Sequence, residues 1–388
     1  MLLGFCNYGI TSTLGKPMTY LKLILFFVIV GFVSIGIFLS LGPKRNSNEK
    51  VTYIPAVETI PDNETQAINQ VRDHIVSALQ TQYPQGVRPM RRDVHAKQHG
   101  CVKAIFEIQN QNLPPELRVG IFARNQNFPA WIRFSNSSGT PKSDSAIDAR
   151  GMAIKLMNVP GSKILKDEKN AQTQDFLLIN LPVFFADTVT NFEKITQPKK
   201  VFTFFFFLTH PRLVITLLPK IFAKTSNPLF TRYWSTTPYA LGPAAVKYSA
   251  VPCSMDGLQK ADRHHKNYLR ESMTATLHNS EACFYFMVQL QNDARNMPIE
   301  DPTVNWNEKS SPFITVAKIR IFPQKFDTDS QMKFCENTSF TPWHTLPEHR
   351  PLGGINRARK VIYETISSLR HKMNNTSRAE PRPVDWPR

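Results

Sequence analysis

An uncharged apolar run near the N-terminus constrains this chain most, because it divides the sequence into a candidate membrane anchor and a polar body. Residues 23–42 read LILFFVIVGFVSIGIFLSLG. A helix rises about 1.5 Å per residue, so about 20 residues cross the roughly 30 Å hydrocarbon core of a bilayer. A cleaved signal peptide would usually have a shorter apolar region and a small-x-small cleavage site, whereas a Pro-Lys-Arg sequence follows here. We therefore predict an uncleaved transmembrane helix over residues 23–42, after an N-terminal segment of residues 1–22.

Positive charges lie on both sides of this apolar run. Lys16 and Lys22 precede it, and Lys44, Arg45 and Lys50 follow it. An excess of Lys and Arg on the cytoplasmic side sets the orientation of membrane helices, so a balanced distribution assigns no side. We expect a single-pass membrane protein whose soluble part lies on a side that the sequence leaves open.

A second apolar region, residues 201–222, reads VFTFFFFLTHPRLVITLLPKIF. Two Pro-containing polar interruptions make it too broken for a membrane span. It is flanked by basic residues, namely Lys199, Lys200, Lys220 and Lys224. Two interpretations stay open: a helix of the protein core, or a helix that lies in the membrane interface with its basic residues at the headgroups.

The chain of 388 residues carries a formal net charge of +17. Nucleic acid, an anionic membrane surface and a bound anionic cofactor would each explain such an excess. No run of Lys and Arg reaches the density of a nucleic-acid-binding arm, and the basic residues are spread along the sequence. We expect a solvated basic surface and no nucleic-acid partner.

The five cysteines are Cys6, Cys101, Cys253, Cys283 and Cys335. They are widely spaced and odd in number, and no two have the C-x-x-C spacing of metal ligands. This pattern predicts neither a disulfide framework nor a zinc site, and buried free thiols are the expectation.

The remaining sequence indicates one mixed domain. Residues 43–90 read as a polar connector with a helix over 64–79, residues 91–374 as the domain, and the Pro- and Arg-rich residues 375–388 as a disordered tail. Within the domain, β-like runs occupy residues 104–108, 130–134, 153–156, 176–179, 284–290 and 313–322, and helical patterns occupy residues 213–222 and 358–372. The predicted class is α+β.

The C-terminal helical pattern carries a candidate ligand. Arg359 and Tyr363 are four residues apart and Arg370 follows seven residues later, so all three share one helix face. A phenol ionises near pH 10, and an adjacent guanidinium stabilises the phenolate, as ferric iron would. Alone, this spacing is more typical of an ordinary amphipathic helix.

Four further segments carry residues suited to chemistry. The first is R-D-V-H-A-K, with Arg92, Val94 and His95; a neutral His is the natural proton carrier near pH 7. The second is W-I-R-F-S, in which Arg133 and Ser135 share one strand face. The others are D-A-R-G-M-A-I-K at residues 148–155, and N-L-P-V-F-F at residues 180–185, which is followed by Phe192.

These five segments, in this order, resemble the catalase family. The resemblance covers residues 91–192 and resumes at the C-terminal helix, and five modest motifs in register are together specific. It implies an antiparallel β-barrel with surrounding helices, α+β in class, preceded here by one transmembrane helix. It also implies haem b (iron) as the cofactor, between the barrel and the helix of Tyr363.

The resemblance implies a role for each matched residue. His95 matches the distal His that moves protons, Ser135 the serine that hydrogen-bonds it, and Val94 the valine that narrows the channel above the iron. Tyr363 matches the iron ligand, which the haem of catalase takes from a tyrosine, and Arg359 matches the arginine that bonds its oxygen. The arginines that hold the haem propionates are matched by Arg92, Arg133 and Arg370. Two phenylalanines, one that packs near the haem and one that lines its distal side, are matched by Phe184 and Phe192.

One position departs from the catalase pattern. A gapless match puts Ile179 at the place of the distal Asn, with Asn180 one residue late. A slip of one residue turns a strand side chain to the opposite face. We expect a β-bulge that lets Asn180 reach the distal side as a third catalytic residue, beside His95 and Ser135; the alternative is that the amide is lost.

The segments around residues 233–239 and 342–359 resemble the small catalase-related proteins, a subgroup with peroxidases and fatty-acid hydroperoxide converters such as coral allene oxide synthase. We therefore expect a haem peroxidase or catalase acting on hydrogen peroxide or organic hydroperoxides. A fatty-acid hydroperoxide isomerase or dehydrase is the alternative, although Val94 is the catalase-type residue where allene oxide synthase has Thr. A non-catalytic haem-binding membrane protein also stays open. The membrane partner would be bound through residues 23–42 and, if the second apolar region lies in the interface, also through residues 201–222. A homo-oligomer stays open as well.

Overall fold

Alternating apolar residues build the strands of this protein, because one face of each strand points into a core and the other away from it. In β2 (Asn127–Asn136), Phe128, Ala130, Ile132 and Phe134 are buried in one apolar cluster. The computed structural model describes residues 55–111, 113–197, 201–259, 261–378 and 380–381. The predicted transmembrane helix over residues 23–42 and the segment before it lie outside the described residues.

The strands close into a barrel. They are β1 (Gln98–Ile108), β2, β3 (Arg150–Met157), β4 (Thr173–Ile179), β5 (Tyr233–Trp234), β6 (Tyr239–Leu241), β7 (Ala244–Pro252), β8 (Ala282–Leu290) and β9 (Ile314–Ile321). Their order is β5-β4-β3-β2-β1-β9-β8-β7-β6, and β5 also pairs with β7, which closes the ring and leaves β6 appended to β7. Every pairing between these strands is antiparallel. The six β-like runs expected from the sequence are confirmed as β1–β4, β8 and β9.

The barrel interior is an aromatic core. Phe106, Phe176 and Phe286 are in mutual contact there, with Phe106 and Phe286 centroids 5.0 Å apart and Phe176 and Phe286 centroids 4.9 Å apart. Each fully buried Phe contributes about 1.5–3 kcal/mol of transfer free energy. Because these inward positions alternate with outward ones, Arg133 and Ser135 of β2 lie on the outer face of the barrel.

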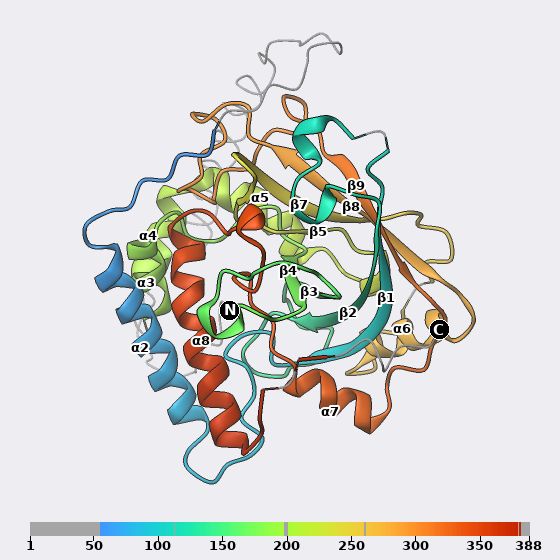
Figure 1. The fold of residues 1–388 in the computed structure, drawn as a ribbon. Coiled ribbons are helices and arrows are strands. Elements are labelled where there is room, and N and C mark those ends of the chain that lie inside the picture. The colour runs from blue at the N-terminus through green and yellow to red at the C-terminus, as the bar shows by residue number, and fades with distance from the viewer. Residues whose placement is uncertain (1–54, 112, 198–200, 260, 379, 382–388) are drawn as a thin grey trace, which may run out of the picture. The chain divides into compact units, whose positions relative to one another are not determined.

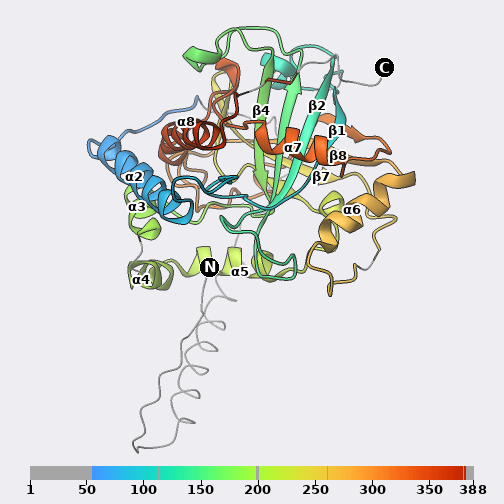
Figure 2. The same cartoon turned by 90° about the horizontal axis from the view of Figure 1, so that it is seen from below.

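Helices lie on more than one side of the barrel (Figures 1 and 2). The helices are α2 (Glu64–Gln82), α3 (Val189–Thr196), α4 (Val201–Thr209), α5 (Pro211–Phe222), α6 (Tyr268–Asn279), α7 (Asp329–Asn337) and α8 (Gly354–Asn374). Figure 1 shows α2, α3 and α8 side by side, and their apolar faces share one buried cluster with residues of α4 and α5. The helix expected over residues 64–79 is confirmed as α2, and it packs against α8.

The start of α8 is held by an ion-pair network. The guanidinium of Arg357 contacts the carboxylates of Glu58 (2.7 Å), Glu64 (2.6 Å) and Glu300 (2.8 Å). The residue before the helix, Gly353, has φ +85, and a Cβ there would lie 2.5 Å from the carbonyl oxygen of Ile299. The position of α8 is therefore fixed at its N-terminus, which matters because this helix carries Arg359, Tyr363 and Arg370.

The cysteine expectation is wrong for the described cysteines. Cys101 is bonded to Cys335 and Cys253 to Cys283, with Cα–Cα distances of 5.7 and 5.5 Å. The first pair is 234 residues apart in the sequence and joins β1 to α7. Spacing cannot reveal such a pair, because the fold brings the partners together. Cys6 lies outside the described residues.

No single helix of the described residues is long and apolar enough to cross a membrane, although α4 and α5 together meet that criterion. They are bent by 104° at His210, however, so the pair is not a straight span. Of the tail expected to be disordered, residues 375–378 and 380–381 are described, and Glu380 accepts a 2.6 Å hydrogen bond from Thr173.

Candidate active site

His95 lies in the loop before β1, against the outer face of the barrel. Its φ is +59, the left-handed region that non-glycine residues rarely adopt. Its backbone NH donates to the carbonyl of Ser137 at 3.0 Å, and its Nδ1 lies 3.0 Å from Oγ of Ser135. Two hydrogen bonds therefore hold the imidazole in one place and leave Nε2 as the nitrogen available for proton transfer.

Gly151 of β3 makes room for this ring. Ser135, Gly151 and Ile179 are directly opposite one another on β2, β3 and β4, so they share the outer face of the barrel. A Cβ at Gly151 would lie 2.5 Å from both Cε1 and Nδ1 of His95 and 2.9 Å from Oγ of Ser135. The imidazole thus packs directly on the strand backbone.

The imidazole of His95 is neutral at physiological pH. Burial, followed by the positive charge of Arg133, lowers its pKa to about 4. The more distant charges of Arg359 and Arg92 lower it further, against an opposite effect of Asp148. Because Arg359 belongs to α8, this helix lies within electrostatic reach of the His95 loop.

Three predicted cofactor ligands contact one residue, Glu336, two of them through its carboxylate and one through its backbone carbonyl. Nη1 of Arg92 lies 3.0 Å from Oε1 of Glu336, and Nη2 of Arg133 lies 3.8 Å from Oε2 of Glu336. Arg370 donates from Nη1 to the Glu336 carbonyl at 2.6 Å. Burial alone would raise the pKa of Glu336, but the charges of these three arginines outweigh it and hold that pKa below its usual value.

The positive charges of these arginines are only partly compensated by neighbouring carboxylates. Burial and the neighbouring Arg92 together lower the pKa of Arg370 to about 9, and the same two causes lower that of Arg133. Among the residues that the structure describes, Nε of Arg133 is buried and has no hydrogen-bond partner. Three guanidinium groups beside the carboxylates of Glu336 and Asp93 leave an excess of positive charge, which a ligand that carries carboxylates would offset.

Arg133 also connects this cluster to His95. Its Nη2 donates to the backbone carbonyl of His95 at 2.8 Å. The Arg133 side chain on β2 therefore belongs to the arginine cluster around Glu336 and also contacts the loop that carries His95.

On α8, the predicted pair of Arg359 and Tyr363 is in contact. Nη2 of Arg359 donates to the Tyr363 hydroxyl at 3.4 Å, and its Nη1 donates to Oδ1 of Asn356 at 3.0 Å and to Oγ1 of Thr237 at 3.3 Å. Burial alone would lower the pKa of Arg359, but Tyr363 and Tyr239 raise it above its usual value. The guanidinium is thus a fixed cation beside the phenol.

Aromatic side chains lie between the end of β4 and the helices. The rings of Phe184 and Phe185 are stacked with centroids 4.3 Å apart, and Phe192 lies 5.5 Å from Phe184. All three belong to the apolar cluster that also contains Tyr363 and Ile179. Val94 is 43% exposed and lies outside the core.

The bulge expected before Asn180 is wrong. The pairing of β3 with β4 runs in register to Gly151 opposite Ile179, and the next NH, that of Asn180, donates to the carbonyl of Arg150 at 2.9 Å. Oδ1 of Asn180 accepts a 2.7 Å hydrogen bond from the NH of Arg150. The Asn180 amide oxygen therefore hydrogen-bonds the backbone of β3. Ile179 is the residue on the face of Ser135 and His95.

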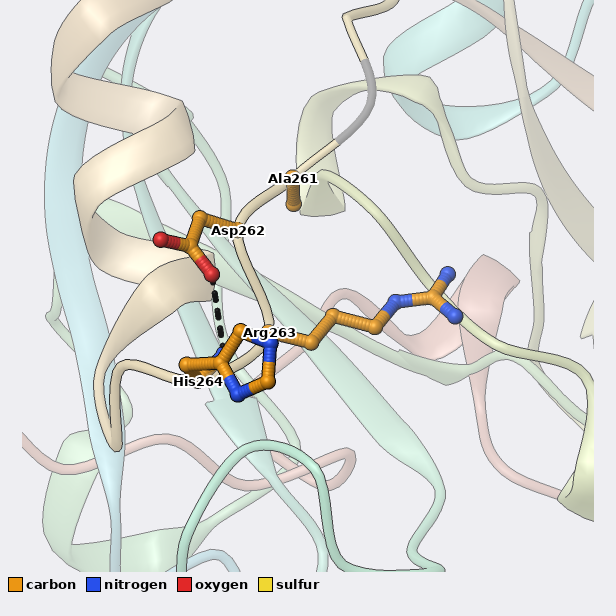
Figure 3. Close-up of a pocket in the computed structure, with 4 residues that line it drawn as sticks. All are labelled: Ala261, Asp262, Arg263 and His264. Atoms are coloured by element: carbon orange, nitrogen blue, oxygen red, sulfur yellow. Dashed lines mark hydrogen bonds between the residues drawn. The ribbon is translucent and has the colours of Figure 1, made fainter.

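Two cavities lie elsewhere. One, of about 450 Å³, is in the loop before α6 and is lined by Ala261, Asp262, Arg263 and His264 (Figure 3). In it the NH of His264 donates to Oδ1 of Asp262 at 3.0 Å. The other is lined by residues of the β1 end and the start of β9. Neither contains a predicted site residue.

Sequence reasoning missed Glu336, Gly151 and the two residues that orient Arg359, namely Thr237 and Asn356. Gly151 stands inside a quoted motif, so its place in a strand could have indicated a close approach to the backbone. Glu336 has no sequence signal of its own, because a single acidic residue on a short helix is ordinarily solvated.

Comparison with solved structures defines the fold as that of catalases. Catalase A from Saccharomyces cerevisiae superposes with a TM-score of 0.58 and 17% identity over 87% of this chain and 72% of that chain. A fungal catalase gives a TM-score of 0.57 and 16% identity over 86% and 70%. The predicted catalase-like barrel with surrounding helices is confirmed.

The sequence itself places the chain in a family. It is 30% identical over 315 residues to the catalase-related peroxidase of Mycolicibacterium paratuberculosis strain ATCC BAA-968 / K-10. The aligned region covers 76% of this chain and 94% of that protein. No protein-family model matches the chain. The protein belongs to the family of catalase-related peroxidases.

Proposed function

We propose that this protein is a haem-dependent oxidoreductase that consumes hydrogen peroxide or organic hydroperoxides. One observation carries the proposal: a half-buried, neutral His95 bonded to Ser135 lies beside an arginine cluster with excess positive charge, and α8 carries the Arg359–Tyr363 pair. Similarity to a catalase-related peroxidase supports the same reaction class.

The residues present fit haem b. Arg92, Arg133 and Arg370 would hold its two propionates, since the carboxylates of Glu336 and Asp93 leave these three guanidinium groups with excess positive charge and Nε of Arg133 is unpaired within the described residues. Tyr363 would be the iron ligand. When bound, the haem iron supplies the redox chemistry of O–O bond cleavage.

Arg359 favours the ionised Tyr363 oxygen that an iron ligand requires. A fixed guanidinium beside a phenol stabilises the phenolate, which is the form that binds ferric iron. Thr237 and Asn356 hold Arg359 from the other side, so the cation cannot turn away.

His95 moves the protons. With Nδ1 occupied by Ser135, Nε2 takes the proton from one peroxide oxygen and returns it to the other as that oxygen leaves. A pKa of about 4 keeps the imidazole unprotonated at neutral pH, and the ring readily gives up a proton that it has accepted.

Peroxide would be oriented here without the distal Asn side chain of the catalase pattern. Ile179 occupies the face on which His95 lies, and the Asn180 oxygen is engaged by the NH of Arg150. We assign Asn180 to support of the Arg150–Gly151 backbone, and peroxide orientation to His95 and Ser135. Phe184 and Phe192 would pack near the haem, and Val94 would narrow the approach to it.

Conversion of a fatty-acid hydroperoxide is the second candidate. It is favoured by the exposed apolar side chains of α4 and α5, such as Phe204 at 64% exposure, which suit a lipid-rich environment. A predicted membrane anchor at residues 23–42 would keep the protein beside such substrates. Val94 favours the peroxidase over the isomerase.

The test is an absorption spectrum of the purified full-length chain after expression with ample haem, followed by peroxide assays. We expect a ferric haem band, oxygen evolution or donor oxidation with hydrogen peroxide, and loss or a shift of the band in Tyr363→Phe. Tyr285→Phe, at an exposed tyrosine of β8, is the matched control and keeps the band.

Absence of a haem band, or an unchanged band in Tyr363→Phe, would refute the cofactor assignment. Consumption of a fatty-acid hydroperoxide without any reaction of hydrogen peroxide would select the second candidate.

A further inference from the structure

The outer faces of α4 and α5 form an exposed apolar surface. Seven of the fifteen exposed large apolar side chains of the described residues lie on these two helices: Val201 (68%), Phe204 (64%), Phe205 (56%), Leu208 (65%), Ile215 (44%), Leu218 (45%) and Phe222 (58%). We refer to these seven residues as the α4–α5 face. A concentration of this kind marks a binding surface more often than chance exposure.

The helices that carry this face are firmly attached to the body. Phe206, Leu213 and Leu217 are 3–4% exposed and belong to the buried cluster shared with α2, α3 and α8. A surface helix normally buries one apolar stripe and turns polar residues outward. α4 and α5 are apolar on both sides, so their outward residues have no role in the packing of the body.

The bend between the helices is also fixed. Nδ1 of His210 lies 2.7 Å from the carbonyl oxygen of Phe206, its ring stacks on the Phe206 ring at 4.0 Å, and Pro211 begins α5. The resulting angle of 104° makes the pair follow the surface instead of crossing a bilayer. In Figure 2, α4 and α5 lie along the lower edge of the body, outside α3.

Charge selects the kind of partner. The segment from Val201 to Lys224 contains no Asp or Glu, and its cations are Arg212, Lys220 and Lys224, all exposed. An apolar face bordered by cations matches a bilayer interface, where acyl chains lie beneath anionic headgroups. A symmetric dimer through the same face would bring these cations together, which disfavours a second copy as the occupant.

We propose that the α4–α5 face docks in the plane of an anionic lipid bilayer, with the phenylalanines of α4 among the acyl chains and Arg212, Lys220 and Lys224 at the headgroups. The proposal rests neither on the haem assignment nor on the predicted anchor, and it resolves the two interpretations left open for residues 201–222 in favour of the interface.

The first experiment uses the full-length chain with residues 23–42 replaced by a Gly-Ser sequence of equal length, so that only the α4–α5 face can bind. Flotation is measured with vesicles of pure phosphatidylcholine and of equal parts phosphatidylcholine and phosphatidylserine. We expect flotation with the anionic vesicles, weakened about fivefold for each charge removed in Lys220→Gln and Lys224→Gln.

The matched variants have serine in place of three apolar residues each. Phe204→Ser with Phe205→Ser and Leu208→Ser should weaken partitioning by at least about 100-fold, since each side chain loses roughly a tenfold contribution. Ile147→Ser with Met255→Ser and Leu258→Ser changes side chains of comparable exposure in loops and should leave partitioning unchanged. Equal unfolding temperatures of the two variants show that both are folded.

A second experiment uses the unaltered full-length chain in the same anionic vesicles, with a phospholipid that carries a photoreactive acyl chain. We expect labelled peptides from residues 201–222. Absence of label there would mean that another segment of the chain covers the face, which would overturn the proposal.

Two flotation results would also overturn the proposal: no flotation of the Gly-Ser protein with either vesicle, or equal flotation of the two triple variants. A dimer in sedimentation that only the α4 triple variant abolishes would overturn it as well. The last would assign the face to a second copy.

Discussion

Gly151→Ala tests the placement of His95 most directly. The added Cβ would lie 2.5 Å from two atoms of the imidazole, whereas ordinary contact begins at 3.4 Å. Gly151 is in β3, paired on one side with β2 and on the other with β4, so its backbone cannot retreat. The ring must therefore move by about 1 Å, which lengthens the His95–Ser135 hydrogen bond from 3.0 Å beyond bonding distance.

The expected loss is large for a single methyl group. Misplacement of a catalytic group by about 1 Å costs on the order of 100-fold in rate. Overpacking of this kind also costs roughly 1–3 kcal/mol of folding free energy. The arginine cluster and Tyr363 do not touch Gly151, so haem content should stay at the wild-type level.

The assay combines peroxide turnover, haem absorption and thermal unfolding on the same preparations. Ser135→Ala is the informative comparison, because it removes the hydrogen bond without adding bulk and should cost less than Gly151→Ala. Wild-type turnover in Gly151→Ala with a full haem band would refute the placement of the ring on the strand. Loss of haem in that variant would show that the site is coupled more widely than the contacts indicate.

Two further changes follow from the charges. Glu336→Gln removes the negative charge of this residue from the arginine cluster. We therefore expect a loss of roughly 2 kcal/mol in the unfolding free energy of the haem-free protein and a smaller loss once haem is added. Glu348→Gln, at an exposed residue, is the control, and equal losses with and without haem would contradict the charge balance. The buried His99 and His349 have pKa values lowered to about 3 by burial, so between about pH 6.5 and 3 the unfolded chain binds protons that the folded chain does not. Stability should therefore fall steadily as pH is lowered through that window in denaturant titrations, and a flat profile would contradict the neutral burial of these imidazoles.

The strands that could be predicted are those whose apolar alternation is complete. In β2, Phe128, Ala130, Ile132 and Phe134 recur at every second position in the core, and the predicted run lies inside the strand; the run for β9 was found within one residue at each end. β5 and β6 have only two and three residues, too short for any period, and exist because neighbouring strands pair with them. β7 contains Lys247, which is buried and donates to the carbonyl of Val304, so a charge stands where the pattern requires an apolar residue.

Most of the candidate site could be predicted because its residues sit in short motifs that local geometry explains. The pairs His95–Ser135 and Arg359–Tyr363 are in contact as expected. The distal amide could not be predicted, because whether a one-residue offset produces a bulge depends on how β3 and β4 pair. The Cys101–Cys335 bond depends in the same way on the fold that brings α7 to β1.

The geometry of Arg133 explains why the two halves of the site form one structure. A left-handed conformation at His95 costs on the order of 1–3 kcal/mol and persists only where surrounding contacts over-determine it. One of those contacts is the bond from Arg133 to the His95 carbonyl, and the same guanidinium faces Glu336. An anionic group that binds the arginine cluster therefore fixes Arg133, and with it the imidazole. His95 and the arginine cluster are coupled through one side chain, so we predict that a change at Glu336 alters peroxide turnover through His95 even though these two residues do not touch.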